Sequence, residues 1–138
     1  MKRLLFLLAI TGCAGAPPPA VSSGLPLGSG VAAADHPLVA VGGEKTTIAA
    51  QKGPKGTLVV FTCNHCPWAR AWAPRLIELG NTYREQGIGV IAISPNDPKI
   101  YPDDNLAAME ERSHRQGMKF VYALDESGVT PKAYAATK

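Results

Sequence analysis

Two cysteines stand three positions apart in this sequence, Cys63 and Cys66, directly after an apolar stretch and directly before an amphipathic one. A thiol attacks a disulfide only as its thiolate, and a free cysteine has a pKa of about 8.5. The start of a helix stabilises an anion through its dipole and its free backbone N–H groups. We therefore expect Cys63 to attack a disulfide and Cys66, one helical turn later and less exposed, to resolve the mixed disulfide.

The residues around the two cysteines fit this chemistry. His65 lies between them, and an imidazole that is cationic near neutral pH would stabilise a Cys63 thiolate and make the disulfide more oxidising. Pro67 suits the first turn of a helix, where its missing N–H costs no hydrogen bond. The expected surroundings of the site also include Thr62, Asn64 and Trp68.

The same residues admit two other interpretations. A structural disulfide is disfavoured, since such bridges usually close longer loops and stabilise more by doing so. A copper or zinc site for metal delivery is the second alternative. Its ligands would be Cys63, His65 and Cys66, with His36 or His114 as the fourth. A c-type haem attachment is excluded, because it needs a histidine directly after the second cysteine, where a proline stands.

Hydrophobic periodicity predicts the elements that position the cysteines. Residues 57–62 are β-branched and apolar on both faces, which predicts a central strand covered by helices. Residues 67–86 predict a helix that Pro74 either kinks or divides in two. Residues 88–93 predict a second strand, so strand, helix and strand form a βαβ unit with parallel strands and a right-handed crossover. The apolar stripe of the helix would consist of Trp68, Trp72, Leu76, Leu79 and Tyr83.

The rest of the folded segment predicts further elements of an α/β domain. They are strands at 37–41, 45–49 and 118–124 and helices at 105–116 and 129–136. The first two strands would pair as a hairpin. Asp103 or Asp104 would cap the helix at 105–116, and His114 would lie on its solvated face.

The N-terminus predicts a secretory leader. Lys2 and Arg3 precede an apolar run, residues 4–10, that is too short to span a bilayer, which takes about 20 residues. The run Ile10-Thr11-Gly12-Cys13 resembles the lipobox of bacterial lipoproteins, in which the cysteine is lipidated and becomes the new N-terminus. An ordinary signal peptide cleaved nearby is the alternative.

The chain therefore divides into three segments: a signal peptide at 1–12, a tether at 13–35 that begins at the lipidated Cys13, and a folded domain at 36–138. Small residues, proline and glycine dominate the tether, which cannot bury enough apolar surface to offset its ordering entropy. We expect the domain on the periplasmic side of a bacterial membrane, held by the lipid. Ala14, in place of the aspartate that retains lipoproteins at the inner membrane, favours the outer membrane.

Composition excludes one large class of function. The 138 residues carry a net charge of +3, and without the leader the 14 basic residues fall to 12, against 11 acidic ones. A chain with so little excess charge and no basic stripe is not expected to bind nucleic acid. We expect a monomeric enzyme without a cofactor. It would exchange disulfides with protein or small-molecule thiols and depend on an upstream reductant.

With strand, CxxC and helix in this order, residues 63–67 resemble the active site of the thioredoxin superfamily. The closer similarity is to its redoxin branch, related to alkyl hydroperoxide reductases and thiol-specific antioxidant proteins. In that branch a Cys-Asn-His-Cys-Pro run precedes a Ser-Pro-Asn-Asp loop and a Tyr-Pro-Asp-Asp-like segment, found here at 63–67, 94–97 and 101–104. The resemblance covers about residues 37–138. It implies a thioredoxin-like three-layer α/β sandwich and an antioxidant or redox-homeostasis role for a redox-active disulfide.

Two departures from the family pattern affect these expectations. Thioredoxin folds carry a cis-proline opposite the CxxC, which here would follow residues 133–137; Pro131 lies too early to serve. We therefore expect a truncated member that lacks the C-terminal β-hairpin and last helix. Peroxiredoxins use a Thr-x-x-Cys arrangement to position peroxide, whereas Thr62 is adjacent to Cys63 and four residues before Cys66. A thiol-dependent peroxidase is accordingly the weaker alternative.

Overall fold

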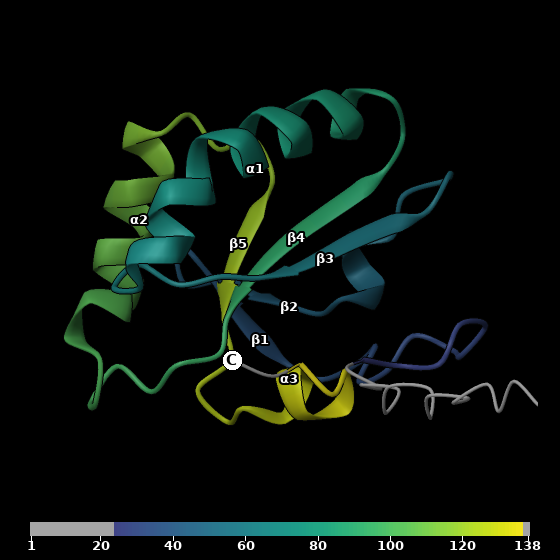
Figure 1. The fold of residues 1–138 in the computed structure, drawn as a ribbon, viewed down its shortest axis with the longest axis horizontal. Helices are drawn as coiled ribbons and strands as arrows, with labels where there is room; N and C mark the ends of the chain where they lie inside the picture. The colour runs from purple at the N-terminus through teal and green to yellow at the C-terminus, as the bar shows by residue number, and fades with distance from the viewer. Residues whose placement is uncertain (1–23, 137–138) are drawn as a thin grey trace, which may run out of the picture.

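The computed structural model describes residues 24–136, and its backbone confirms the predicted βαβ unit. β3 (Thr57–Phe61) leads through the cysteine loop into α1 (Pro67–Glu85), which returns to β4 (Gly89–Ser94). The two strands pair in parallel along their length (Figure 1). α1 is a single helix with Pro74 inside it, so the alternative of two helices is wrong.

Five strands form one sheet in the order β2-β1-β5-β4-β3. β1 (Leu38–Ala40) and β2 (Lys45–Thr46) form the predicted hairpin, and β5 (Val121–Leu124) joins β1 to β4. β3 therefore lies at an edge of the sheet, and the expectation that it is the central strand is wrong. β4 is the buried strand instead, since five of its six residues are buried.

The strand predicted at 118–124 begins at Val121, three residues after its predicted start. The backbone N–H of Met118 donates to the Ser113 carbonyl at 3.0 Å and that of Lys119 to the Asn81 side chain at 2.8 Å. These bonds tie the segment to the ends of the two neighbouring helices, so pairing with β4 starts only at Val121.

Helices cover both faces of the sheet, which gives the expected three layers. α1 and α2 (Leu106–Arg115) lie on one face, and α3 (Val129–Ala133) lies on the other (Figure 1). β4 alternates between the two cores, with Val90 and Ala92 beneath α1 and α2 and with Ile91 and Ile93 on the opposite side. Because the period of a strand is two, this single strand anchors both layers.

The apolar stripe predicted for α1 does not face the core. Trp68 is 77% exposed and Trp72 58% exposed, and Leu79 and Tyr83 are also exposed. The buried residues of α1 are instead Ala73, Ile77 and Gly80. Both stripes recur at helical spacing, but small side chains let the helix axis approach the sheet closely, whereas two tryptophans do not.

Gly80 is the closest approach between α1 and the core. A Cβ atom added at Gly80 would lie 2.4 Å from a ring carbon of Phe120. We expect Gly80→Ala to lower the free energy of unfolding by about 1–3 kcal/mol through overpacking, although alanine is otherwise favoured in helices by about 1 kcal/mol. Urea denaturation measures this. Gly30→Ala is the control, because nothing lies within 4 Å of that site; equal stability of the two variants would contradict the packing argument.

A buried carboxylate, Asp125, connects β5 to α3. It accepts hydrogen bonds from the backbone N–H groups of Ser127 and Gly128, each at 3.1 Å, and of Thr130 at 2.8 Å. The hydroxyls of Ser127 and Thr130 donate to it as well. Burial alone would raise its pKa, but the hydrogen bonds from Ser127 and Thr130 outweigh burial and lower the pKa of Asp125.

This depressed pKa predicts a pH dependence of stability. A carboxylate with a lowered folded-state pKa contributes fully above its unfolded pKa of about 3.9, and the contribution is lost as the pH falls through the folded value. We expect Asp125→Asn to lower the free energy of unfolding near neutral pH by about 1–3 kcal/mol and to flatten its decline in acid. Urea denaturation across this range measures both effects. Glu126→Gln, at the exposed neighbouring position, should follow the wild type; a shared profile of all three proteins would contradict the role of Asp125.

The predictions for the leader, including Cys13 and the first part of the tether, lie outside the described residues. Within residues 24–136, no helix is long and apolar enough to cross a membrane. The chain joins the fold at Ala34, whose carbonyl accepts a hydrogen bond from the Ala49 N–H at 2.9 Å. The last residues of the predicted tether therefore contact the folded segment.

Candidate active site

The cysteine loop connects β3 to α1, and the structure reverses the expected environments of its two thiols. Cys63 is buried, with 9% of its surface exposed, whereas Cys66 is only half-buried. Cys66 is the N-cap residue of α1, and Pro67 occupies the first helical turn as expected. The expectation that Cys66 is the less exposed thiol is therefore wrong.

The two thiols also differ in acidity in the order opposite to the one expected. The backbone N–H groups of Ala69 and Trp68, in the first turn of α1, lower the pKa of Cys66. A hydrogen bond from the Cys63 thiol lowers it further. Burial raises the pKa of Cys63, and the nearby charge of Asp104 adds to this effect. The free N–H groups at the start of α1 stabilise the thiolate of its N-cap residue, which is Cys66 and not Cys63.

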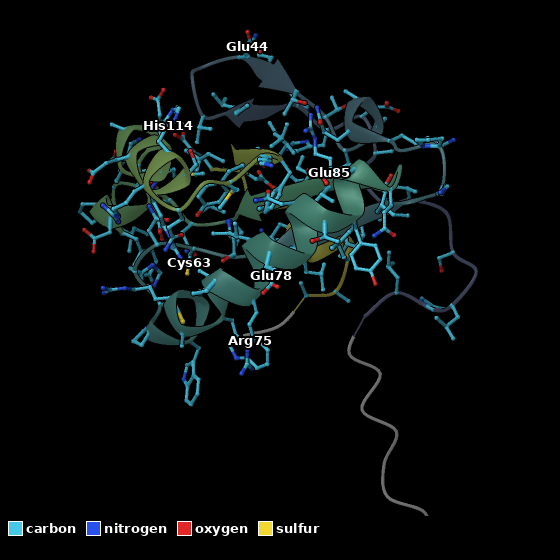
Figure 2. All side chains as sticks on the ribbon, turned by 90° about the horizontal axis from the view of Figure 1, so that it is seen from above. Glu44, Cys63, Arg75, Glu78, Glu85 and His114 are labelled. Atoms are coloured by element: carbon cyan, nitrogen blue, oxygen red, sulfur yellow. The ribbon has the colours of Figure 1, made fainter. Side chains whose placement is uncertain are left out.

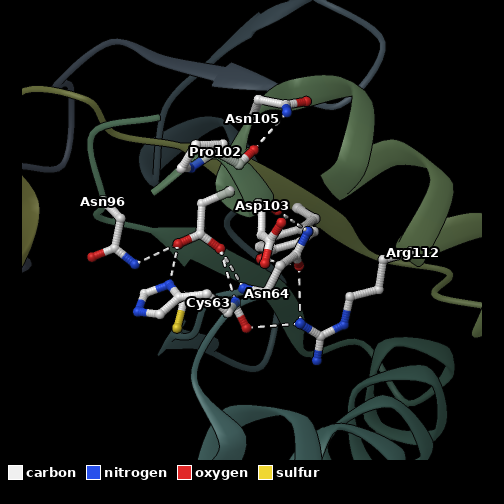
Figure 3. Close-up of polar contacts among 10 residues, drawn as sticks. Cys63, Asn64, Asn96, Pro102, Asp103, Asn105 and Arg112 are labelled. Atoms are coloured by element: carbon white, nitrogen blue, oxygen red, sulfur yellow. Dashed lines mark hydrogen bonds and ion pairs between the residues drawn. The ribbon is translucent and has the colours of Figure 1, made fainter. Parts of the chain in front are cut away.

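Figure 3 shows the polar contacts around Cys63 and Asn64 of the cysteine loop. Asp104 binds the backbone of this loop. Its side chain is fully buried, and one carboxylate oxygen accepts the backbone N–H groups of Asn64 and, at 3.3 Å, of His65. The other oxygen pairs with His65 Nδ1 at 2.6 Å and accepts from Asn96 Nδ2 at 2.8 Å. A buried carboxylate with four N–H partners is fully satisfied and fixes the loop in one conformation.

The sequence placed Asp103 or Asp104 at the start of a helix, and that assignment is wrong. Asn105 caps α2, because its side chain accepts from the Ala108 N–H at 2.9 Å. Asp103 and Asp104 belong to the preceding 3-10 turn η2 (Pro102–Asp104). Only the Tyr-Pro-Asp-Asp segment of the family resemblance pointed to this region. Tyr101 of that segment stacks on His65, with ring centroids 4.3 Å apart and planes 10° from parallel.

Arg112 of α2 also binds the cysteine loop. Its Nη1 donates to the Cys63 carbonyl at 2.7 Å and to Asn64 Oδ1 at 2.9 Å, and the guanidinium is buried. Tyr122 of β5 donates to the same Asn64 oxygen at 3.1 Å. The sequence prediction missed Arg112; its spacing of three from the buried Met109 was the available signal.

An open apolar groove lies between β3 and α1, and the residues that flank the cysteine loop in the chain, Thr62 and Trp68, line it. Its lining includes Thr62, Trp68 and Trp72, together with Phe61 and Leu76. Trp68 thus lines a groove next to the reactive loop, as expected for the surroundings of the site. Because both tryptophans are exposed, the groove presents an apolar surface to solvent.

The structure does not assemble the expected metal ligands. His36 lies 3.0 Å from the Ser127 hydroxyl, and His114 points outward from α2 near Glu110 (Figure 2). Neither supplies a fourth ligand to the cysteine loop. The Cys63 Sγ, a ring nitrogen of His65 and an oxygen of Asp104 lie within 4.8 Å of one another. These residue types suit a metal, but every acceptor position of Asp104 already has an N–H partner, so Asp104 serves the loop and not an ion.

Comparison with known proteins places this geometry in context. The model of the AhpC/TSA family matches residues 30–138. A hypothetical protein from Sinorhizobium meliloti is 31% identical, with a TM-score of 0.71 over 81% of this chain and 61% of its own. An uncharacterized conserved protein from Geobacillus kaustophilus is 29% identical, with a TM-score of 0.66 over 76% of this chain and 57% of its own.

A more distant structure shows the fold alone. Peroxiredoxin Q from Xanthomonas campestris is 19% identical, with a TM-score of 0.59 over 77% of this chain and 62% of its own. The chain spans less than two thirds of the length of each of these three proteins. A comparison with curated proteins finds no match.

The family match and the geometry agree on the architecture. A parallel βαβ unit with the cysteine loop between its first strand and its helix is the thioredoxin-like α/β fold expected from the sequence. The matched range contains both cysteines together with Asp104 and Arg112, the residues that hold their loop. The chain belongs to the AhpC/TSA family.

Proposed function

We propose that this protein is a thiol–disulfide oxidoreductase in which Cys66 attacks and Cys63 resolves, the reverse of the roles expected from the sequence. The observation that carries the proposal is the contrast between the two neighbouring thiols. Cys66 is half-buried and its pKa is lowered, whereas Cys63 is buried and its pKa is raised. An accessible thiolate begins disulfide exchange, and a protected thiol beside it completes the exchange.

The reaction balances with these two residues alone. The Cys66 thiolate attacks a substrate disulfide, forms a mixed disulfide and releases the first substrate sulfur as a thiolate. Cys63 then attacks the Cys66 sulfur, which closes the Cys63–Cys66 disulfide and releases the second substrate sulfur. The substrate gains two electrons and the enzyme loses two, so an upstream thiol must reduce the enzyme again. The same steps in reverse oxidise a substrate dithiol.

The groove between β3 and α1 favours a protein substrate. Its exposed tryptophans, Trp68 and Trp72, offer an apolar surface at the start of the helix that follows Cys66. Exposed aromatic side chains beside a reactive group are typical of surfaces that bind apolar segments of a partner. We therefore propose disulfides of unfolded or extended protein segments as the substrate class.

Insulin reduction tests the proposal. We expect the purified full chain to accelerate reduction of insulin by dithiothreitol, and we expect Cys66→Ser and Cys63→Ser each to remove the acceleration. Cys13→Ser, which changes the third cysteine, should keep the wild-type rate. Equal rates for the wild type and Cys66→Ser would contradict the proposal.

Peroxide is the second candidate substrate, because redoxins of this family include thiol-dependent peroxidases as well as oxidoreductases. The same Cys66 thiolate would attack one peroxide oxygen, break the O–O bond, release the other oxygen as water or an alcohol and become a sulfenic acid. Cys63 would then resolve the sulfenic acid as a disulfide with release of water. This alternative predicts consumption of hydrogen peroxide at the expense of dithiothreitol, dependent on Cys66. Peroxide consumption without insulin reduction would favour it.

We further propose that the enzyme acts on the periplasmic side of a bacterial membrane, as a monomer anchored by a lipid on Cys13. The proposal rests on the basic and apolar leader that ends in Ile10-Thr11-Gly12-Cys13. Labelling with a radioactive fatty acid should mark the wild type and not Cys13→Ser. Equal labelling of the two would contradict the anchor.

A further inference from the structure

We propose that His65, oriented by Asp104, is the general base that removes the proton from Cys63 when Cys63 resolves the mixed disulfide. The inference rests on the proposed oxidoreductase function and adds two residues to its machinery. His65 is the catalytic residue of this step, and Asp104 is the positioning residue that acts through it.

The geometry brings the three groups together. The Cys63 Sγ, a ring nitrogen of His65 and a carboxylate oxygen of Asp104 all lie within 4.8 Å of one another. His65 Nδ1 pairs with Asp104 at 2.6 Å, and the Tyr101 ring stacks on the imidazole at 4.3 Å. Two neighbours thus fix the ring, which remains one third exposed. A histidine whose one nitrogen is held by a buried carboxylate keeps the other nitrogen free to accept a proton.

The resolving step needs such a group. Burial raises the pKa of Cys63, so this thiol is protonated near neutral pH and is a poor nucleophile until it loses its proton. The free backbone N–H groups in the first turn of α1 do not lower the pKa of Cys63, because they stabilise the Cys66 thiolate instead. A buried resolving thiol therefore requires a base at hand.

The other titratable and charged groups around the thiol are unsuited to this role. Cys66 is itself bound to the substrate at that moment, and Arg112 donates to the Cys63 carbonyl. Burial raises the pKa of Tyr122, so its phenol stays protonated. All acceptor positions of Asp104 already hold N–H groups. The imidazole of His65 is the remaining neighbour with a nitrogen that can accept a proton.

The step is balanced in atoms and electrons. The S–H bond of Cys63 breaks and its proton passes to the imidazole of His65, directly or through one water molecule, and the imidazolium is stabilised by the Asp104 carboxylate. The Cys63 sulfur then bonds to the Cys66 sulfur, and the bond between Cys66 and the substrate sulfur breaks. The substrate leaves as a thiolate and takes the proton back from His65.

Ellman's reagent separates this step from the first attack. In the Cys13→Ser background, which removes the third thiol, each molecule of enzyme should release one thionitrobenzoate when Cys66 attacks the reagent and a second when Cys63 resolves the mixed disulfide. We expect His65→Gln to slow the second release about 10²-fold near neutral pH, the scale of general-base catalysis, and to change the first release by less than about threefold. Alkaline pH should restore the second release, because hydroxide then deprotonates Cys63.

Two further variants complete the experiment: Asp104→Asn tests the positioning residue, and His114→Gln is the control. Asparagine can keep its oxygen toward the backbone N–H groups of Asn64 and His65, while its amide group replaces the oxygen that pairs with His65 Nδ1. We therefore expect a selective slowing of the second release by about tenfold. His114→Gln, on the exposed side of α2, should match the wild type in both phases. An unchanged second release in His65→Gln, or equal slowing of both releases, would overturn the inference. A wild type that never gives a second release would instead refute the proposed function itself.

Discussion

Cys66→Ser is expected to abolish formation of any mixed disulfide, whereas Cys63→Ser is expected to form one and hold it. A serine hydroxyl does not ionise near neutral pH, so we expect the rate of attack on a disulfide to fall by at least about 10³-fold, the scale seen when a catalytic nucleophile is removed. Cys63→Ser keeps the half-buried, acidic Cys66 but loses the thiol that would release the substrate.

Mass spectrometry after exposure to oxidised glutathione distinguishes the two variants. We expect a stable glutathione adduct on Cys66 in Cys63→Ser, and no adduct on either of these positions in Cys66→Ser. The wild type should show chiefly the Cys63–Cys66 disulfide. Cys13→Ser in the Cys63→Ser background controls for the third cysteine. A trapped adduct on Cys63 in Cys66→Ser would restore the roles expected from the sequence.

Arg112→Met is expected to cause the largest loss of stability among substitutions near the site. It removes the buried donors to the Cys63 carbonyl and to Asn64 Oδ1, which lie 2.7 Å and 2.9 Å from the guanidinium. These acceptors would remain without their charged partner, and we expect the free energy of unfolding to fall by about 2–4 kcal/mol. Thiol exchange should slow as well, because the cysteine loop loses one of its two fixed supports.

The matched control lies three residues away on the same helix. Arg115 is exposed and pairs with Glu111 at 2.6 Å. Exposed ion pairs contribute little, so Arg115→Met should change the free energy of unfolding by less than about 1 kcal/mol. Urea denaturation of both variants measures the difference. Equal losses would mean that the bonds from Arg112 to the loop contribute nothing specific.

The order of strand, helix and strand around the cysteines was predictable from the sequence, because it depends on local hydrophobic periodicity. The apolar strand segments around the amphipathic stretch at 67–86 specify a βαβ unit, and such units are parallel. The position of the cysteines between strand and helix follows from the same pattern. Proline at 67 and glycine at 87, with a positive φ of 91° just past the helix, mark the two ends of α1.

The burial of particular side chains was not predictable in the same way. Two stripes of α1 have apolar spacing, and only the tertiary structure selects the small one around Gly80 over the tryptophans. The edge position of β3 likewise depends on which strands lie beside it in the sheet. The local sequence does not show which stripe of α1 is buried, and it does not show whether β3 is a central strand or an edge strand.

The supports of the active loop depend on contacts between distant parts of the chain. Asp104 and Arg112 lie 40 and 49 residues from the loop groups they bind. An aspartate directly before a predicted helix is usually its cap, and an arginine among charged residues is usually solvated. The same long-range contacts reverse the expected acidity of the thiols, since they bury Cys63 and leave Cys66 at the helix start.

In the proposed mechanism Cys66, and not Cys63, is the reactive thiolate of this loop. Alkylation by iodoacetamide as a function of pH, with each cysteine followed by peptide mass spectrometry, tests this most directly. We expect Cys66 to be alkylated first, with an apparent pKa below the value of about 8.5 for a free cysteine, and Cys63 to react only at higher pH. Alkylation of Cys63 before Cys66 would contradict this assignment.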